Sequence, residues 1–384
     1  MRAKRNIALP VVLAAILTVA PNVQARQSRF NDLAPLLEPI REKYDLPALA
    51  AAVVVDGKTA AWGASGFRRY GTDVKVTSED KFHIGSCTKA MTATLVAMLV
   101  DRGKLSWDTT LAQALPELAE DMHPDYRAVT LRHLLAHRAG LAPSSRSWPK
   151  GKSFMDMHNL PGSATEQRLA YAKMMLAQKS EAKPGEKYIY SNAGYSILGL
   201  IAERAMDKPW ETLMREMLFE PLRMGSAGFG AMGARGGIDQ PWQHKIEDGK
   251  LLQVEPGPLS DNPPVLGPGG TVHCSMRHWA AFVAAHLNGP KGKGGLLEPE
   301  TFKVLHDPDF GGNYAGGWQI THRQWADGKV LTHTGSNNMN FAVVWMAPRR
   351  NFAVLVASNQ GQGDVAKACD EAAWALIKKF LLKE

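Results

Sequence analysis

Ser86 and Lys89 are the first residues whose types and spacing could do chemistry. They stand three positions apart at the start of a predicted helix, and residues three apart share a helix face. A serine hydroxyl is a poor nucleophile until a base takes its proton, and a partly desolvated lysine can have a pKa low enough to help. The helix N-terminus would also stabilise an oxyanion formed at Ser86. A capped surface helix explains the same pattern without chemistry.

The second motif is Tyr190-Ser191-Asn192, which follows the Pro184-Gly185 turn and precedes a predicted helix. In an extended segment Tyr190 and Asn192 project to the same side. Tyr190 can then relay a proton, and Asn192 can hold a substrate amide. A buried tyrosine beside an asparagine helix cap is the structural alternative.

The third motif is His333-Thr334-Gly335, which ends a predicted strand. A glycine at that place lets a substrate approach the backbone edge. The next backbone amide, that of Ser336, is then a candidate oxyanion donor. Taken alone, this motif is explained equally well by a structural role.

Hydrophobic periodicity places these motifs on helices and strands. Helices are predicted at residues 31–44, 85–102, 131–137, 166–177, 193–205, 210–218, 276–287 and 365–382. Strands are predicted at residues 48–55, 59–64, 330–333, 340–347 and 351–358. The stretch 225–270 contains too many turn residues for a detailed assignment.

Strands therefore lie near both ends of the chain and helices lie in the middle. The economical arrangement is an α+β (mixed α/β) fold: one antiparallel sheet built from both ends, flanked by the terminal helices, with a helical lobe inserted. We expect residues 26–384 to form a single domain. Its sheet lobe is expected at about 26–80 and 310–384, and its helical lobe at about 81–309.

The composition is that of a globular protein, because 45% of the 384 residues are hydrophobic and 21% are charged. These values exclude a disordered or fibrous chain. The length exceeds the roughly 250–300 residues that one core serves, which also favours two lobes. Of the net charge of +8, three positive charges lie in the first 25 residues, and the remaining excess of +5 is spread along the chain rather than clustered. We therefore expect no nucleic-acid partner, and an anionic envelope surface fits the charge better.

Residues 1–25 have the pattern of a cleaved secretory signal. Positions 2, 4 and 5 are basic, residues 7–20 are apolar, and small residues stand at positions 23 and 25. The apolar stretch is shorter than the roughly 20 residues of a membrane-spanning helix. The rest of the sequence also has no apolar stretch long enough to span a membrane. We expect a periplasmic or secreted mature chain that begins at Arg26 and has no membrane span. An uncleaved anchor is the alternative.

The three cysteines are an odd number for an oxidising compartment and suggest no disulfide framework. Buried free thiols are the expected state of Cys87, Cys274 and Cys369. A disulfide between Cys274 and Cys369 stays open from the sequence.

Other residue patterns favour neither a metal nor a cofactor. His133 and His137 have the spacing of a helical zinc pair, but Leu134 stands where a zinc protease carries its glutamate. A second group, His273, Cys274 and His278, has no convincing fourth ligand. The glycine-rich residues 267–270 lack the Lys-Ser/Thr ending of a phosphate loop. Residues 154–157 are expected to form a mobile lid or a surface loop.

Taken together and in this order, the three motifs resemble those of the penicillin-recognising serine hydrolases. That family comprises class C β-lactamases, secreted DD-carboxypeptidases, and related esterases and D-aminopeptidases. The Tyr-Ser-Asn form of the second motif is typical of the class C branch. The resemblance runs from about residue 33 to residue 380. Around the motifs it includes residues 82–89, 134–141, 184–199, 267–271 and 333–357.

The resemblance implies a role for each motif residue. Ser86 would attack an ester, amide or lactam carbonyl and become acylated, while Lys89 and Tyr190 would share the acid/base work as a coupled pair. The backbone N–H groups of Ser86 and Ser336 would form the oxyanion hole. Asn192 would contact the acyl-amide side chain of the substrate. The leaving-group side would be lined by His333 and Thr334, and no metal is needed.

His333 is a departure from the lysine that β-lactamases of this type carry. A lysine is a permanent cation suited to the carboxylate of a penicillin or cephalosporin, whereas histidine, with an ordinary pKa of about 6.5, is only partly charged at neutral pH. Related DD-carboxypeptidases with histidine use an arginine on the neighbouring strand, and here residues 316–320 have none before Arg323. We therefore expect no strong cephalosporinase, and better processing of carboxylate-bearing substrates at mildly acid pH.

Two classes of function stay open. The first is a secreted serine hydrolase that acts through an acylated Ser86 on a small-molecule or cell-wall-derived substrate: a D-Ala-terminated peptide, a β-lactam or a small ester. The second is a catalytically silent binding or regulatory protein on the same fold. The presence of Ser86, Lys89 and Tyr190 together favours the hydrolase.

Overall fold

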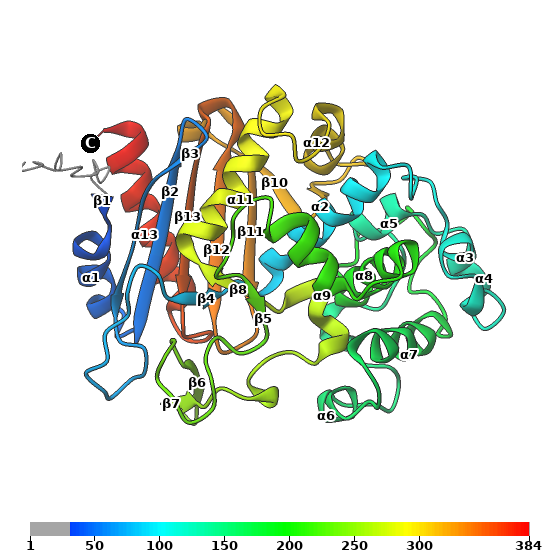
Figure 1. Ribbon diagram of the computed structural model, residues 1–384, viewed down its shortest axis with the longest axis horizontal. Coiled ribbons are helices and arrows are strands. Elements are labelled where there is room, and N and C mark those ends of the chain that lie inside the picture. Colours follow the sequence, from blue (N-terminus) through cyan, green and yellow to red (C-terminus); the bar gives the residue numbers. More distant parts are fainter. Residues whose placement is uncertain (1–30, 384) are drawn as a thin grey trace, which may run out of the picture. The chain divides into compact units, whose positions relative to one another are not determined.

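The computed structural model of the protein describes residues 31–383 (Figure 1). The expected signal segment, residues 1–25, and the expected first mature residue, Arg26, lie outside the described residues. Within the described part, no helix combines the length and apolar character that a bilayer crossing requires. All three cysteines are buried and free, so the Cys274–Cys369 disulfide is not formed.

An eight-stranded sheet, in the order β1-β3-β2-β13-β12-β11-β10-β9, forms the centre of the fold. Its neighbouring strands are antiparallel except for the pair β1–β3. Its strands are β1 Asn31–Asp32, β2 Ala48–Val55, β3 Lys58–Gly66, β9 Tyr314–Ala315, β10 Trp318–Arg323, β11 Gly328–Ser336, β12 Phe341–Ala347 and β13 Phe352–Ser358. The strands come from both ends of the chain, so the α+β fold class expected from the sequence is correct.

Alternation along β2 divides its side chains between two hydrophobic cores. Ala50 and Ala52 face one core, whereas Leu49, Ala51 and Val53 face the other. The same division occurs along β13. Because both faces of these strands are covered, their sequences are almost uninterruptedly apolar rather than alternating between apolar and polar.

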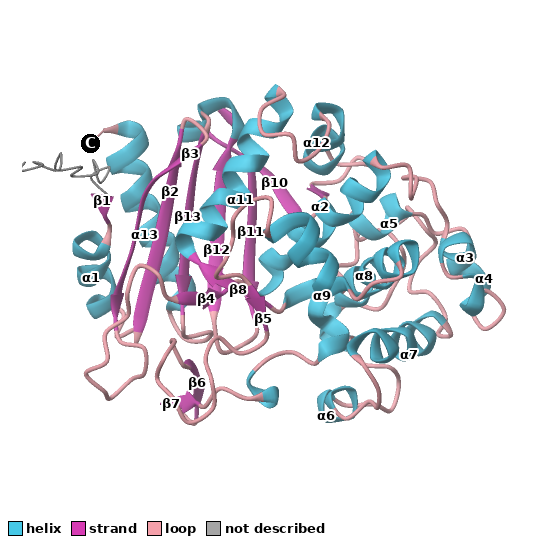
Figure 2. Ribbon diagram, in the orientation of Figure 1, coloured by secondary structure: helices cyan, strands magenta, loops and turns pink. Residues whose placement is uncertain are grey.

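Helices cover both faces of the sheet (Figure 2). Packed on one face are α1 Ala34–Lys43 and α13 Val365–Ile377, and packed on the other is α11 Met276–Asn288. The helix α2, Thr88–Asp101, is buried from Thr88 to Leu99 and packs against α8, Asn192–Met206. The remaining helices are α3 Leu111–Ala114, α4 Pro124–Arg127, α5 Leu131–Leu135, α6 Phe154–His158, α7 Ala164–Leu176, α9 Trp210–Leu213, α10 Gly267–Gly270 and α12 Pro299–His306.

Several elements differ from those predicted. The helix expected at 31–44 is preceded by the short strand β1, and α11 packs on the sheet although it falls within the range expected for the helical lobe. Two further predicted helices, 210–218 and 365–382, end in π-helical segments. The residues expected to form a lid or loop, 154–157, lie in α6, where Met157 is fully buried.

Small strands that the sequence did not reveal complete the fold. A three-stranded sheet, β4-β8-β5, consists of Lys81–His83, Val272–Ser275 and Gly228–Phe229. A separate hairpin, β6–β7, joins Gln243–Glu247 to Lys250–Val254 within the stretch left unassigned. Strand β4 leads directly into the segment that carries Ser86.

A buried ion cluster ties together three helices beside α10. The guanidinium of Arg168, in α7, pairs with Glu203 of α8 and with both carboxylate oxygens of Glu211 of α9, at 2.9 and 2.8 Å. Its Nη1 also donates to the carbonyl oxygen of Pro264 at 3.1 Å. Because Pro264 precedes α10, the cluster also fixes the segment that leads to Gly269.

Replacing Arg168 by methionine leaves the carboxylate of Glu203 buried without its partner, so we expect Arg168→Met to lower the free energy of unfolding by about 3–5 kcal/mol. The matched control is Arg204→Met, because Arg204 pairs with Glu117 at the surface and is expected to contribute about 0–1 kcal/mol. Thermal and urea unfolding of both variants measure the difference. Equal losses in the two variants would contradict the importance of the buried cluster.

Candidate active site

Ser86 lies in a one-turn 3-10 helix, η1 (Gly85–Cys87), between β4 and α2. Gly85 has a positive φ of 49°, a conformation that glycine adopts without strain. The turn leaves Ser86 partly exposed while Gly85 and Cys87 are buried. Ser86 is therefore partly exposed at the start of a helix that is buried from Thr88 to Leu99.

Lys89 is fully buried one turn after Ser86, and its amino group contacts three oxygens. Its Nζ lies 3.0 Å from Oγ of Ser86, 2.8 Å from Oδ1 of Asn192 and 2.7 Å from the carbonyl oxygen of Gly269. Burial disfavours the charged form and lowers the pKa of Lys89 to about 7. A lysine with this pKa has a substantial neutral fraction near neutral pH and can accept a proton from Ser86.

Tyr190 lies immediately before α8 and beside both residues. Its ring centroid is 4.9 Å from Nζ of Lys89, and Ser86 is close enough to its hydroxyl to lower the pKa of the phenol slightly. Burial raises the pKa of Tyr190 well above its ordinary value, so the phenol keeps its proton at neutral pH. The structure thus brings together Ser86, Lys89, Tyr190 and Asn192, as the motifs predict.

Two serines that the motifs did not identify form hydrogen bonds with the segment that contains Tyr190 and Asn192. The amide of Ser144 donates to the carbonyl oxygen of Tyr190 at 2.9 Å, and its hydroxyl accepts from the amide of Asn192 at 3.0 Å. Nδ2 of Asn192 donates to Oγ of Ser147 at 3.4 Å. With Oδ1 held by Lys89, the side chain of Asn192 is fixed from both ends.

His137 is a further residue of the site whose position the sequence did not predict. Helix α5 ends at Leu135, and His137 has a φ of 55°, so it does not share a helix face with His133 as a zinc pair would. Nδ1 of His137 accepts from the amide of Ser191 at 3.1 Å. The ring centroid of His137 lies 4.4 Å from that of Tyr190 and 4.6 Å from that of Tyr314. His137 therefore packs against Tyr190, the candidate proton relay.

Two glycines bring β11 against η1. A Cβ atom on Gly335 would collide with the carbonyl oxygen of Ile84 and lie 2.8 Å from the amide nitrogen of Ser86. A Cβ atom on Gly85 would collide with the amide nitrogen of Ser336. The amides of Ser86 and Ser336 therefore lie at one close backbone crossing, where two N–H donors can approach one oxyanion.

His333 is buried, with 6% of its surface exposed, whereas Thr334 and Ser336 are exposed on the same strand. Burial and the neighbouring Lys89 lower the pKa of His333 to about 3, against a smaller opposing effect of its hydrogen bond to the Thr334 carbonyl. Mild acid does not charge such a group. The burial of His333 therefore opposes the protonation on which the expected gain of carboxylate-bearing substrates at mildly acid pH depends.

Arg323 does not supply the positive charge that a lysine at position 333 would provide. It lies at the far end of β10, paired in register with Gly328 of β11, and its guanidinium stacks over the ring of Trp345 at 5.3 Å. Trp345 packs against the core on the α13 side of the sheet. Arg323 thus lies away from His333.

The glycine-rich residues 267–270 form the short helix α10, which lies against α2. The carbonyl of Gly269 accepts from Lys89, and that of Pro268 accepts from Oγ1 of Thr92 at 2.7 Å. These residues supply backbone acceptors to the buried face of α2.

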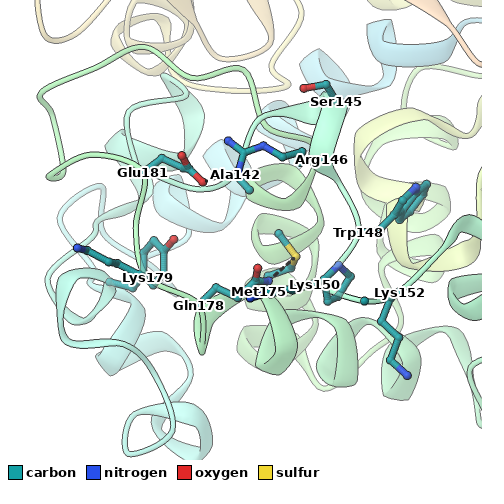
Figure 3. Close-up of a pocket in the computed structure, with 13 residues that line it drawn as sticks. Ala142, Ser145, Arg146, Trp148, Lys150, Lys152, Met175, Gln178, Lys179 and Glu181 are labelled. Carbon is teal, nitrogen blue, oxygen red and sulfur yellow. Dashed lines mark hydrogen bonds and ion pairs between the residues drawn. The ribbon is translucent and has the colours of Figure 1, made fainter.

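A hollow of about 500 Å³ lies beside the segment that contains Ser144 and Ser147 (Figure 3). Arg146 and Glu181 form an ion pair of 3.0 Å on its wall, and Lys152 and Lys179 extend away from each other. Neither Ser86 nor Lys89 lines it. This hollow is therefore separate from the candidate active site.

The fold and these contacts define the class of protein. Solved structures with the same fold include the octameric penicillin-binding protein homologue from Pyrococcus abyssi, with a TM-score of 0.72, 22% identity and coverage of 91% of this chain and 78% of that one. A penicillin-binding protein from Bacillus halodurans has a TM-score of 0.71, 22% identity and coverage of 88% and 99%. The class is thus the β-lactamase and penicillin-binding-protein fold. The chain belongs to the beta-lactamase family, whose model matches residues 33–378.

Sequence relatives agree with this assignment. Penicillin-binding protein 4 of Amycolatopsis lactamdurans is 27% identical over 351 residues, which cover 87% of this chain and 84% of that protein. Unguisins hydrolase ungD' of Aspergillus campestris is 25% identical over 341 residues, which cover 86% of this chain and 61% of that protein. The family is generally one of serine hydrolases, and some of its members are inactive.

We expect Gly335→Ala to lower reaction with substrate by at least about a hundredfold, because the added methyl group forces β11 and η1 apart and displaces the two amides. Gly225→Ala is the matched control, since a Cβ atom there meets nothing within 4 Å. Labelling by a fluorophosphonate probe, with circular dichroism to establish folding, measures the effect. A folded Gly335→Ala protein that labels at the rate of the control would contradict the close crossing.

Proposed function

We propose that the protein is a secreted serine hydrolase that acts through an acyl-enzyme on Ser86. The observation that carries the proposal is the 3.0 Å contact between Oγ of Ser86 and Nζ of a fully buried Lys89. Burial lowers the pKa of that lysine to about 7, which suits a general base at neutral pH. No metal takes part in the proposed reaction.

The proposed acylation needs only groups present at the site. Oγ of Ser86 bonds to the carbonyl carbon of an ester, amide or lactam, its proton passes to the pair Lys89–Tyr190, and the amides of Ser86 and Ser336 hold the oxyanion of the tetrahedral intermediate. As this intermediate collapses, the bond to the leaving group breaks and the pair gives the proton to the leaving oxygen or nitrogen. Water, activated by the same pair, later hydrolyses the acyl bond and returns the proton to Ser86.

The proposed substrate is a small molecule or a peptide, including one derived from the cell wall. In this proposal Asn192, whose side chain contacts Lys89 and Ser147, would receive an amide on the acyl side, and Thr334 and His333 would line the leaving-group side. Similar proteins include a penicillin-binding protein, a hydrolase of unguisins and a D-stereospecific amidohydrolase from Streptomyces. The basic and apolar pattern of residues 1–25 supports export to the periplasm or beyond.

We expect the protein to hydrolyse p-nitrophenyl acetate and butyrate faster than a chromogenic cephalosporin, with both activities reduced to background by Ser86→Ala. Mass spectrometry of quenched reactions should show one acyl group on the peptide that contains Ser86. Turnover that survives in Ser86→Ala would refute the mechanism. Stoichiometric acylation without turnover would instead identify a silent binding protein.

The acylation rate should rise with pH and reach half its maximum near pH 7, because only neutral Lys89 accepts the proton of Ser86 and its pKa is lowered to about 7. Stopped-flow measurement of p-nitrophenol release, corrected with Ser86→Ala at each pH, gives the profile. A midpoint near the ordinary lysine pKa of about 10.4 would show that Lys89 is not the desolvated base.

A further inference from the structure

Four aromatic rings form one wall beside the candidate nucleophile. The ring centroid of His333 lies 5.7 Å from that of Tyr314 and 6.1 Å from that of Tyr190, and Tyr188 lies 5.9 Å from Tyr314. Tyr314 is buried, whereas Tyr188 is 43% exposed. The wall therefore extends from the interior, next to Tyr190, to the surface.

Hydrogen bonds determine which nitrogen of His333 carries the proton. Nδ1 contacts the carbonyl oxygen of Thr334, which can only accept, so Nδ1 is the donor. Nε2 then presents its lone pair and accepts from the hydroxyl of Tyr314 at 3.0 Å. Both nitrogens of His333 are satisfied in the neutral ring, and neither needs a charge.

The titratable groups that face His333 do not include a carboxylate that would favour a charged ring. They are Lys89, His137, Tyr190 and Tyr314. A protonated His333 would be buried beside Lys89, and both groups disfavour a second positive charge. His333 therefore stays neutral across the range in which proteins of this kind are assayed.

Lys89, Arg323 and Arg138 are each engaged with other groups. The amino group of Lys89 is engaged with three oxygens, and Arg323 stacks over Trp345 on the α13 side of the sheet. Nη1 of Arg138 donates to the backbone carbonyl of Glu186 at 3.2 Å, and its charge lowers the pKa of Tyr188 against the larger effect of burial. Arg138 thus lies near the exposed end of the wall, whereas a carboxylate placed against His333 and Tyr314, at the buried end, would lose water without gaining an ion pair, which costs free energy.

The leaving group must depart on this side, because it receives its proton from the pair Lys89–Tyr190 and the wall begins next to Tyr190. We propose that the wall formed by His333, Tyr314, Tyr190 and Tyr188 selects substrates whose leaving alcohol or amine is uncharged. This inference rests on the proposed hydrolase function and narrows its substrate class: uncharged esters and amides are favoured over substrates whose leaving part carries a carboxylate, such as peptides ending in D-Ala.

Two acetate esters with closely similar frames test the proposal. One releases methyl 3-hydroxybenzoate, and the other releases 3-hydroxybenzoate, whose carboxyl group is ionised throughout the range from about pH 5.5 to about pH 8. We expect kcat/KM of the full-length protein to favour the uncharged ester by at least about tenfold. The ratio should be constant over this pH range because His333 does not titrate within it.

His333→Lys supplies the missing cation and should raise kcat/KM for the charged ester relative to the uncharged one by at least about tenfold. His322→Lys is the matched control, because His322 is exposed on β10 and the same substitution there should leave the ratio unchanged. If His333→Lys does not fold, inhibition of the unmodified protein by the two released phenols gives an independent ratio, and the uncharged phenol should bind more tightly.

Three results would overturn the proposal while leaving the proposed hydrolase intact: equal kcat/KM for the two esters, a gain of the charged ester below about pH 6.5, or a preference for the charged ester that disappears in Arg138→Gln. The variant Ser86→Ala distinguishes a failure of the hydrolase mechanism from a failure of the charge selectivity. If turnover of the uncharged ester survives in that variant, the hydrolase mechanism fails. If turnover requires Ser86 but ignores charge, only the selectivity fails.

Discussion

The buried amino group of Lys89 is the constraint on which the arrangement of the site depends. An amino group removed from water must find acceptors within the protein, and the three that Lys89 finds belong to η1, α8 and α10. The segment η1 directly precedes Lys89 in sequence, whereas the acceptors in α8 and α10 lie 103 and 180 residues away. A single desolvated group thus determines how distant segments meet, and its depressed pKa is a consequence of the same burial.

Glycines at close backbone contacts make the burial of Lys89 sterically possible. A Cβ atom on Gly317 would collide with the backbone of Ala90, so the edge of the sheet approaches α2 directly after Lys89. At Gly85 and Gly335 the sheet meets η1 in the same way. On the other side, the cluster of Arg168 with its two carboxylates fixes the helices and the segment before α10. The helix that bears the candidate nucleophile is therefore held between a sheet edge and a helical layer.

The sequence predicted the parts of this architecture that depend on local patterns. Strand β13 follows from an uninterrupted apolar and β-branched stretch, helix α11 follows from apolar periodicity, and the pairing of Ser86 with Lys89 follows from their spacing on a helix face. It did not predict His137, Ser144 or Tyr314, because each acts on a motif through contacts between residues distant in sequence. The lowered pKa of His333 did not follow from the sequence for the same reason: the ordinary pKa of a histidine applies in water, and burial is a property of the folded chain. Two-residue strands such as β5 and β9 are too short to have a period.

The order of the strands has a consequence for how the chain reaches this structure. Strand β2 pairs with β3 on one side and with β13 on the other, so its second partner is about 300 residues later in sequence. Contacts of such high sequence separation slow folding. Until β13 is available, the apolar edge of β2 stays open to pairing with another chain. The β2–β3 hairpin therefore depends on the last quarter of the polypeptide for protection, and a nascent chain has to be kept from self-association until its C-terminal strands have emerged.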